Sequence, residues 1–331
     1  MKDPAASNLS ALIILAACAL ASWGINLALP PYLGSLFLLI GINALLAVSL
    51  NLVNGVAGQF SLGHAGFMAL GAYTAAWLST GPLASLFASG TGSQAGFICV
   101  ILAAALVAGL AGWLVGLPSL RLRGDYLAIV TLGFGEIIRI SLLNTNALGG
   151  ARGFIDIPPA GGAAWVFGLL ALACLLCHRF MSGSAGRALL SVREDEIAAE
   201  ALGVNSTRYK VAAFAASAAF AGVAGALFAH LEGFIQPDSF GFMKSVEIVV
   251  MVVLGGMGSM SGALLAAALL TVLPEALRPL KELTGVDLRM VLYSLSLILL
   301  MLFRPQGLLG RYEAWTHPWL GRLRPRPKTH S

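Results

Sequence analysis

No aspartate, glutamate, lysine or arginine occurs between Asp3 and Arg121, so residues 4 to 120 form a stretch of 117 positions without formal charge. One helical crossing of a bilayer takes about 20 apolar residues, and this stretch is long enough for several. The chain of 331 residues is 58% hydrophobic and 11% charged, whereas about 25% of the residues in a soluble domain are charged. This excludes an ordinary soluble protein, and we expect an all-α polytopic integral membrane protein.

Apolar runs give the positions of the expected spans. They cover residues 9–29, 36–53, 64–80, 95–117, 125–143, 164–180, 211–231, 246–273 and 289–303. The run 246–273 is interrupted by the glycine-rich stretch 255–262, which splits it into two short halves. We therefore expect about eight to ten crossings. Counting the halves separately makes the number even and places both termini on one side.

The basic residues support this topology. Most of the 20 lysines and arginines fall on one proposed side: Lys2, Arg121, Arg123, Arg179, Arg187, Arg193, Arg208, Lys210, Arg304 and the tail. The opposite side holds Arg152, Lys244, Arg278, Lys281 and Arg289. Because cytoplasmic segments are enriched in Lys and Arg, both termini are expected in the cytoplasm. The net charge of +5 thus reports topology and not a nucleic-acid partner.

Two glycine-rich interruptions, 54–64 and 255–262, follow one apolar half and precede another. Backbone that leaves a helix at membrane depth needs partners in protein or in a water-filled cavity. Such paired breaks are typical of a pseudo-symmetric transporter core with the substrate path between them. The alternative is two short cytoplasmic turns. Gln59, Ser61 and His64 either line the path or satisfy the broken backbone, His64 then being a loop-to-helix cap.

Three ionisable residues lie in or beside the expected spans. Glu136 and Arg139 are spaced i, i+3 in the run 125–143 and could pair. Ionisable residues inside a membrane are costly and suggest a substrate role. The pair could instead be structural, or Arg139 could extend toward the interface. Glu247 is either an external gate residue or a solvated helix start.

Residues 183–210 form the one long polar insertion, which has helical periodicity and Gly203 as its expected stop. We expect one amphipathic helix here. The acidic centre, with Arg193 followed by Glu194, Asp195 and Glu196, disfavours anionic lipid. Docking in the groove of a partner protein is the better interpretation.

The cysteines carry no expected chemistry. All four lie in apolar stretches, which disfavours disulfides and zinc. Cys174 and Cys177 form a C-x-x-C pattern on one face of an expected membrane helix, where small-residue packing is favoured over redox chemistry. We expect neither a metal site nor a cofactor.

Several motifs resemble a known family. Glu200-Ala201-Leu202-Gly203 is similar to a degenerate form of the coupling loop of ABC importer permeases. Residues 58–67, 124–132, 201–210 and 304–308 resemble the LivM-type permease of branched-chain amino acid importers, in the expected order. The resemblance extends from about residue 35 to about residue 311. The motif 124–132 adds Tyr126 and Thr131 to the pathway candidates, which are Gln59, Ser61, His64, Tyr126, Thr131, Glu136, Arg139 and Glu247.

The resemblance implies a transport subunit and not an enzyme. It implies a single transmembrane permease domain, residues 1–331, in a bacterial inner membrane, with a second, LivH-type permease, two ATPases and a periplasmic substrate-binding protein. Residues 183–210 would be its ATPase-coupling segment, through Arg193, Glu196, Glu200, Ala201, Gly203 and Arg208. No Gly-x-x-x-x-Gly-Lys-Ser/Thr motif occurs in this chain, so ATP hydrolysis is expected on the partner subunits.

Some alternatives stay open from the sequence. The same architecture serves urea or short amides and small aromatic carboxylates. An autonomous secondary transporter would use Glu136, Glu247 and His64 as a proton or ion relay.

The small-residue patterns Gly112-x-x-x-Gly116, Gly258-x-x-x-Gly262 and 212–226 predict close helix packing, either within the chain or with the second permease. The tail 311–331 is expected to be disordered and held near anionic membrane lipid.

Overall fold

A computed structural model describes residues 30–88, 93–119, 124–277, 294–295, 298, 302 and 307–310. The expected first span, 9–29, and the basic tail, 311–331, lie outside the described residues. So do Arg121, Arg123 and most of the expected span 289–303.

The described residues form helices and no strand, which confirms the expected all-α class. The long helices are α2 (Pro31–Asn51), α3 (His64–Thr80), α5 (Ser93–Ser119), α6 (Asp125–Asn144), α7 (Ala163–Ser182), α10 (Ser206–Glu232), α11 (Phe242–Gly255) and α12 (Met260–Ala276). The short ones are α4 (Ala84–Ala88), α8 (Ser184–Glu194), α9 (Glu196–Ala201), the π-helical turn η1 (Leu52–Val56) and the 3-10 turns η2 (Asn146–Leu148), η3 (Gly150–Arg152) and η4 (Pro237–Phe240).

Five helical segments in the described part of the chain are long and apolar enough to cross a membrane. They are Pro31–Val56, Gln94–Ser119, Tyr126–Asn144, Ala163–Ser182 and Ser206–Glu232. Each coincides with an apolar run of the sequence. The expected run 246–273 is divided as its glycines predict, because α11 ends at Gly255 and α12 begins at Met260.

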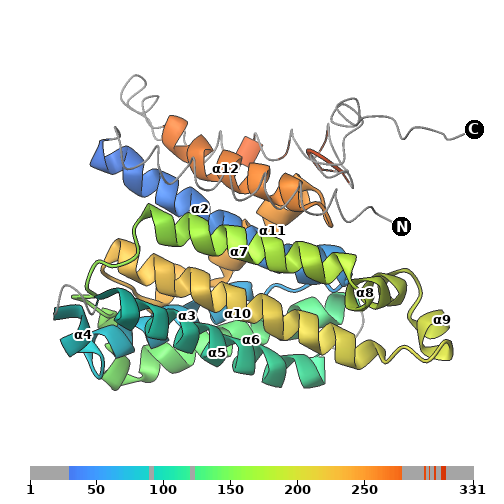
Figure 1. Cartoon of the computed structure of the whole chain (residues 1–331), viewed down its shortest axis with the longest axis horizontal. Coiled ribbons are helices and arrows are strands. Elements are labelled where there is room, and N and C mark those ends of the chain that lie inside the picture. Colours follow the sequence, from blue (N-terminus) through green and yellow to red (C-terminus); the bar gives the residue numbers. More distant parts are fainter. Residues whose placement is uncertain are drawn as a thin grey trace, which may run out of the picture.

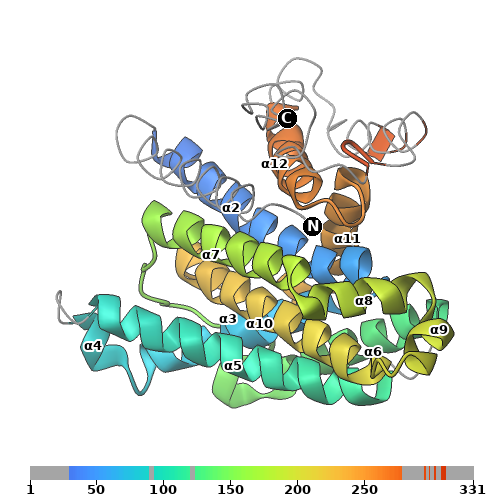
Figure 2. The same cartoon turned by 45° about the vertical axis from the view of Figure 1, so that its right-hand side comes forward.

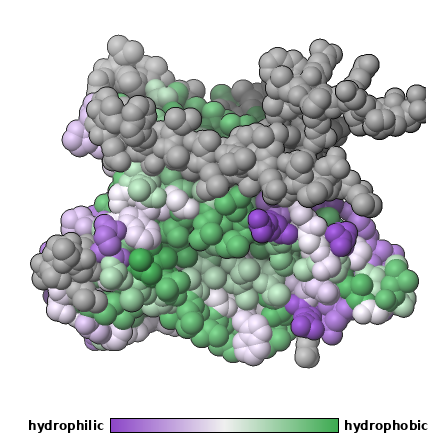
Figure 3. Space-filling view, viewed as in Figure 1, coloured by the Kyte–Doolittle hydropathy of each residue, from purple (hydrophilic) through white to green (hydrophobic). Residues whose placement is uncertain are grey.

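Helix α10 is the centre of the bundle. It packs against α3 and α5 on one side and against α2 on the other, and α2 in turn packs against α7, α11 and α12. Figures 1 and 2 show the resulting arrangement, with α3, α5 and α6 on one side of α10 and α12 on the other. Figure 3 shows hydrophobic residues over the middle of this bundle and hydrophilic residues toward its two ends. This is the surface expected of a bundle that crosses a bilayer.

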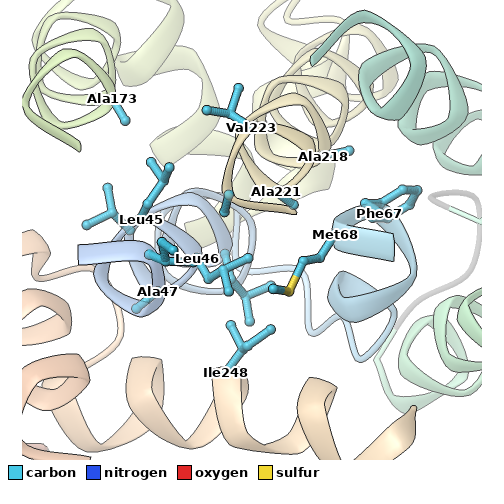
Figure 4. Packing of buried hydrophobic residues seen from close by; sticks show 14 of the residues in the cluster. Leu45, Leu46, Ala47, Phe67, Met68, Ala173, Ala218, Ala221, Val223 and Ile248 are labelled. Atoms are coloured by element: carbon cyan, nitrogen blue, oxygen red, sulfur yellow. The ribbon is translucent and has the colours of Figure 1, made fainter. Parts of the chain in front are cut away.

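The core lies where α2 is enclosed by its neighbours. Leu45 and Leu46 of α2 are fully buried, as is Ile248 of α11. Figure 4 shows Leu45 and Leu46 next to Ala221 of α10, with Ile248 and Met68 of α3 on the adjoining side of the same cluster. Burial of this apolar surface holds α2 against both α10 and α11.

Glycine allows α3 and α10 to touch through their backbones. A Cβ on Gly71 would lie 2.1 Å from the carbonyl oxygen of Gly222, and one on Gly225 would lie 2.0 Å from that of Met68. A Cβ on Gly112 of α5 would likewise lie 2.4 Å from the Ala218 side chain. Gly112 and the glycines of the 212–226 stretch are therefore packed closely within the chain.

Candidate functional site

The two glycine-rich breaks of the sequence meet in the fold. The first follows α2, where η1 and the non-helical residues 57–63 lead to α3. The second is the loop 256–259 between α11 and α12. A Cβ on Gly55 would lie 2.3 Å from the backbone nitrogen of Gly258, so the two backbones are in direct contact. We call this meeting point, formed by Asn51, Gly55, Gly58, Gly256 and Gly258, the glycine junction.

Hydrogen bonds hold the junction together. The Gly258 N–H donates to Asn51 Oδ1 at 2.8 Å, which joins the second break to the end of α2. Gly258 has a φ of +92°, a conformation that a residue with a side chain adopts only with strain. Beside it, the Leu308 N–H donates to the Leu254 carbonyl at 2.7 Å. The part of the 304–308 motif that the structure describes thus lies against the junction.

The backbone that leaves the helix after η1 finds its partners in protein. Asn54 Oδ1 accepts a hydrogen bond from the Ser61 N–H at 3.1 Å. Thr131 Oγ1 accepts one from the Leu62 N–H at 3.1 Å, and Ser245 Oγ accepts one from the Ala65 N–H at 3.2 Å. This is the arrangement that non-helical backbone needs inside a membrane. Ser61 and Thr131 are both buried in it, and Gln59 is half-buried.

His64 is the first residue of α3 and is buried. Its Nε2 lies 2.8 Å from Ser49 Oγ on α2. The Ser217 hydroxyl of α10 donates to the Ser49 carbonyl at 2.6 Å. The imidazole therefore bonds across helices and does not cap the N-terminus of α3, whose N-cap residue is Gly63.

A second polar cluster lies on α6. Arg139 Nε donates to Glu136 Oε2 at 2.8 Å, so the expected i, i+3 pair is formed. Arg139 Nη1 also donates to Asp238 Oδ1 of η4 at 2.9 Å. The Asp238 side chain is 72% exposed. Two carboxylates thus share one guanidinium at the surface, so the cluster presents both signs of charge. Tyr126, on the same helix, is exposed and apart from this cluster.

Glu247 belongs to a third polar group. Lys244 Nζ donates to Glu247 Oε2 at 3.0 Å and to Asn43 Oδ1 at 3.3 Å. Asn43 Nδ2 then donates to Thr271 Oγ1 at 2.9 Å. The group links α11, α2 and α12, so the carboxylate of Glu247 is ion-paired within the bundle.

The polar insertion 183–210 forms two helices, and the expectation of one amphipathic helix is wrong. Asp195 is extended, with φ −153° and ψ 106°, and separates α8 from α9. Its Oδ1 accepts a hydrogen bond from the Ala198 N–H at 3.0 Å, which makes Asp195 the N-cap of α9. Figures 1 and 2 both place α8 and α9 at one end of the bundle, where the chain turns into α10.

One ion pair and one side-chain hydrogen bond fix this segment to α10. Lys210 Nζ, on a side chain that is only 4% exposed, donates to Glu196 Oε1 at 2.6 Å. Ser206 donates to Glu200. Asn205 Oδ1 caps α10 by accepting from the Arg208 N–H at 3.0 Å. These contacts leave the turn between α9 and α10 facing outward.

We call the exposed apolar residues Ile197 of α9 and Leu202 of that turn the apolar tip. Ile197 is 71% exposed and Leu202 is 85% exposed, and Ala201 and Gly203 beside them are exposed as well. By contrast, Leu189 and Val192 of α8 are buried against the bundle. The apolar residues that follow one helical periodicity in the sequence therefore lie on two different surfaces. Those of α8 face the bundle, and those of α9 and the turn face outward.

Arg193 points into the bundle. Its Nη1 donates to the carbonyl oxygen of Gly55 at 2.8 Å, and its Nη2 pairs with Glu194 at 2.7 Å. Its Cγ lies 2.5 Å from the position of a Cβ on Gly58. The fold thus gathers Gln59, Ser61, His64 and Thr131 around the first break, whereas Glu136, Arg139 and Glu247 lie in separate clusters.

Sequence reasoning missed Asn43, Asn51 and Asp238. Asn43 and Asn51 are polar positions in an apolar run, spaced eight apart on α2, and this spacing is the available signal. Asp238 follows Pro237 in a loop and has no comparable signal. In the part of the chain that the structure describes, no three His, Cys, Asp or Glu side chains are grouped so as to hold a metal ion.

Comparison with known proteins gives a consistent picture. The family model for the branched-chain amino acid transport system permease component matches residues 32–302. The chain is 41% identical over 302 residues to the high-affinity branched-chain amino acid transport system permease protein LivM of Salmonella typhimurium, a match that covers 80% of this chain and 67% of the relative. It is 28% identical over 294 residues to the permease protein LivH of Escherichia coli K12, covering 82% and 92%. No solved structure matches.

Proposed function

The chain belongs to the branched-chain amino acid transport permease family, and we propose that it forms one half of the membrane pathway of an importer for branched-chain or other hydrophobic amino acids. It is a multi-pass permease of the ABC transporter class. Its partners in the proposal are a second permease, two ATPases that supply the energy, and a periplasmic binding protein in a bacterial inner membrane. Relatives of both the LivM and the LivH name support a pair of unlike permeases.

The observation that carries the energy-coupling part of this proposal is the apolar tip. Ile197 and Leu202 are largely exposed at the end of a segment held to α10 by the Lys210–Glu196 ion pair. The exposed residues Glu194, Asp195 and Glu200 of the same segment carry acidic charge, which disfavours contact with anionic lipid. A small apolar knob with a charged rim is the surface that inserts into a groove on another protein. We assign that groove to an ATPase, and the α8–α9 end of the bundle to the cytoplasm together with both termini.

The charged cluster around Arg139, at the end of the bundle away from α8 and α9, supports an amino acid as the substrate. Arg139, Glu136 and Asp238 present both signs of charge at the surface. An amino acid carries one charge of each sign on its backbone, so such a cluster can receive it without holding it tightly. From there the apolar side chain would travel along the contact with the second permease.

The test is to purify the tagged chain from native membranes in mild detergent, identify what co-purifies by mass spectrometry, and assay the eluate for ATPase activity. We expect a second permease and ATPase subunits with the wild-type chain. Leu202→Asp should lose the ATPases, because a charge then occupies the apolar tip. Met243→Asp is the matched control, since Met243 is 78% exposed but lies on α11.

Gly203→Pro is an independent second variant. Gly203 has a φ of +86° and its N–H donates to the Glu200 carbonyl, and proline can provide neither. Loss of the ATPases from this variant as well would place the contact on the turn. A lone chain that moves solute in liposomes on an ion gradient would instead contradict the importer and support a secondary transporter.

A further inference from the structure

One side chain connects the segment at the end of the bundle with the glycine junction. Arg193 is near the C-terminus of α8, directly before the Glu194–Asp195 turn into α9. Its guanidinium donates to the Gly55 carbonyl at 2.8 Å and lies 3.7 Å from the position of a Cβ on Gly258. Its aliphatic part covers Gly58. A single residue of the coupling segment thus reaches both breaks.

The electrostatics favour this position. Gly55 lies in η1, at the C-terminal end of the helical segment that begins at Pro31. The last carbonyl oxygens of a helix have no partner within it and carry partial negative charge. A guanidinium placed there neutralises that charge and makes a charge-assisted hydrogen bond, which is about twice as strong as a neutral one. The Nε and Nη2 edge of the guanidinium donates to Glu194 Oε1, so the orientation of the guanidinium is fixed.

The junction itself is closed but not fully satisfied. The backbones of Gly55 and Gly258 touch, which leaves no space for a solute between the two breaks. Among the described residues, Asn54 Nδ2 is buried in the first break without a hydrogen-bond partner. A buried unpaired donor is destabilising, so the closed junction depends on the hydrogen bonds that it does make, from Gly258 to Asn51 and from Arg193 to Gly55. The bond from Arg193 is the one that an outside protein can reach, because it originates in the segment that carries the apolar tip.

We propose that Arg193 is the latch through which the α8–α9 segment holds the glycine junction closed. Movement of this segment by a bound partner withdraws the guanidinium from the Gly55 carbonyl and allows the two breaks to separate. Arg193 is thus a positioning residue that acts on the pathway and not a contact residue for the ATPase. The proposal rests on the proposed function for what moves the segment, but the latch itself is a property of this chain.

The first experiment measures the junction directly. Ser61 is buried beside the junction and bonded to Asn54, so Ser61→Cys reports its opening through reaction with a water-soluble thiol reagent. The native cysteines are replaced beforehand: Cys18, Cys99, Cys174 and Cys177. Arg193→Gln is expected to raise the labelling rate about tenfold or more, as loss of one charge-assisted hydrogen bond predicts. Arg193→Lys, which keeps the charge, should give a smaller increase.

Arg187→Gln is the matched control. Arg187 is on the same helix, and its guanidinium donates to the carbonyl of Ser182, the last residue of α7, at 3.2 Å, away from the junction. Its replacement removes the same charge but leaves the junction bonded, so the labelling rate should stay at the wild-type value. Equal labelling rates in the wild type, Arg193→Gln and Arg187→Gln would overturn the latch.

The second experiment uses the complete importer in proteoliposomes with its binding protein, and measures ATP hydrolysed per solute taken up. Arg193→Gln should retain the ATPase subunits and ATP hydrolysis while uptake falls, so that this ratio rises several-fold. Loss of the ATPase subunits from the variant would make Arg193 a docking residue and overturn the latch. If the wild-type importer carries no amino acid, the proposed function fails, whereas thiol labelling of the Ser61→Cys variant still decides the latch.

Discussion

Gly55 and Gly258 lie in backbone contact at the point where two broken helices meet, with the Gly258 nitrogen 2.3 Å from where a Cβ on Gly55 would be. Asn51 bonds one break to the other, and Arg193 bonds the first of them to α8. The contact requires that Gly55 has no side chain, whereas Gly258 is restricted to glycine by its φ of +92°. Because the two breaks come from opposite halves of the sequence, the junction joins the first half of the chain to the second.

The first prediction concerns this contact. Gly55→Ala should lower the free energy of unfolding by roughly 1–3 kcal/mol, the usual cost of forcing a methyl group into a filled core. Gly133→Ala is its control, because a Cβ there meets nothing within 4 Å. Thermal unfolding of both purified variants in the same detergent measures the difference. Equal midpoints would show that the breaks are free to move apart, contrary to the contact described.

Sequence reasoning predicts the helices well for a simple reason. An apolar run of the right length can satisfy its backbone in a membrane only as a helix, so α2, α5, α7 and α10 follow from composition. Glycine-rich interruptions in such runs end helices locally, which also places the ends of α11 and α12. These are properties of neighbouring residues and need no knowledge of the fold.

The contacts between distant segments could not be predicted in this way. Nothing local to Gly55 or Gly258 indicates that they meet, and nothing local to Arg193 indicates that it points inward. Asp195 shows the other kind of failure. Sequence reasoning assigns the Asp195 carboxylate to an acidic helix surface. Aspartate is also a preferred N-cap residue, and in the structure Asp195 caps α9 and so divides one expected helix into two.

The second prediction concerns the ion pair between Lys210 and Glu196. Glu196→Gln leaves the buried ammonium of Lys210 without its carboxylate, so α9 should separate from α10 more often. We expect the amide hydrogens of α9 to exchange about tenfold faster, measured by mass spectrometry. The double change Glu196→Leu with Lys210→Met should restore slow exchange, because it removes both charges together.

Arg208→Gln is the control for that experiment, since it neutralises an exposed residue of the same segment. Unchanged exchange in Glu196→Gln would mean that α9 is held by its apolar contacts alone. Faster exchange in Arg208→Gln as well would indicate a general effect of charge and not of the pair.

The third prediction concerns the surface cluster on α6. Asp238→Asn leaves Arg139 with one carboxylate partner, and because Asp238 is 72% exposed the change should cost less than about 1 kcal/mol of stability. If the cluster receives the substrate, KM for uptake should rise about threefold to tenfold, corresponding to the loss of one weak ionic contact, with kcat nearly unchanged.

Asp156→Asn is the matched control, because Asp156 is exposed and lies in the loop that pairs with the chain just before η4. Its replacement removes the same charge outside the cluster and should leave KM unchanged. A rise in KM for both variants would show a general attraction between negative charge and the binding protein or substrate, and would remove the specific role of Asp238.

The fourth prediction decides between the two roles that the sequence left open for His64. If the imidazole has a structural role, it stabilises the fold through its hydrogen bond to the Ser49 hydroxyl. The Ser49 carbonyl in turn accepts a hydrogen bond from Ser217 of α10. His64→Ala and Ser49→Ala should then each destabilise the chain by roughly 1–3 kcal/mol, because each leaves a buried polar group unpaired. The double variant should cost about 1 kcal/mol less than the sum, since the same bond is lost only once.

Uptake by the same variants completes this test. A structural His64 predicts that His64→Ala and Ser49→Ala lower transport in proportion to the amount of folded chain, with the same KM for solute. A His64 that lines the pathway predicts a changed KM in His64→Ala alone, because Ser49 is buried behind it on α2. The geometry favours the first outcome, since a ring nitrogen bonded to Ser49 at 2.8 Å is already engaged between helices.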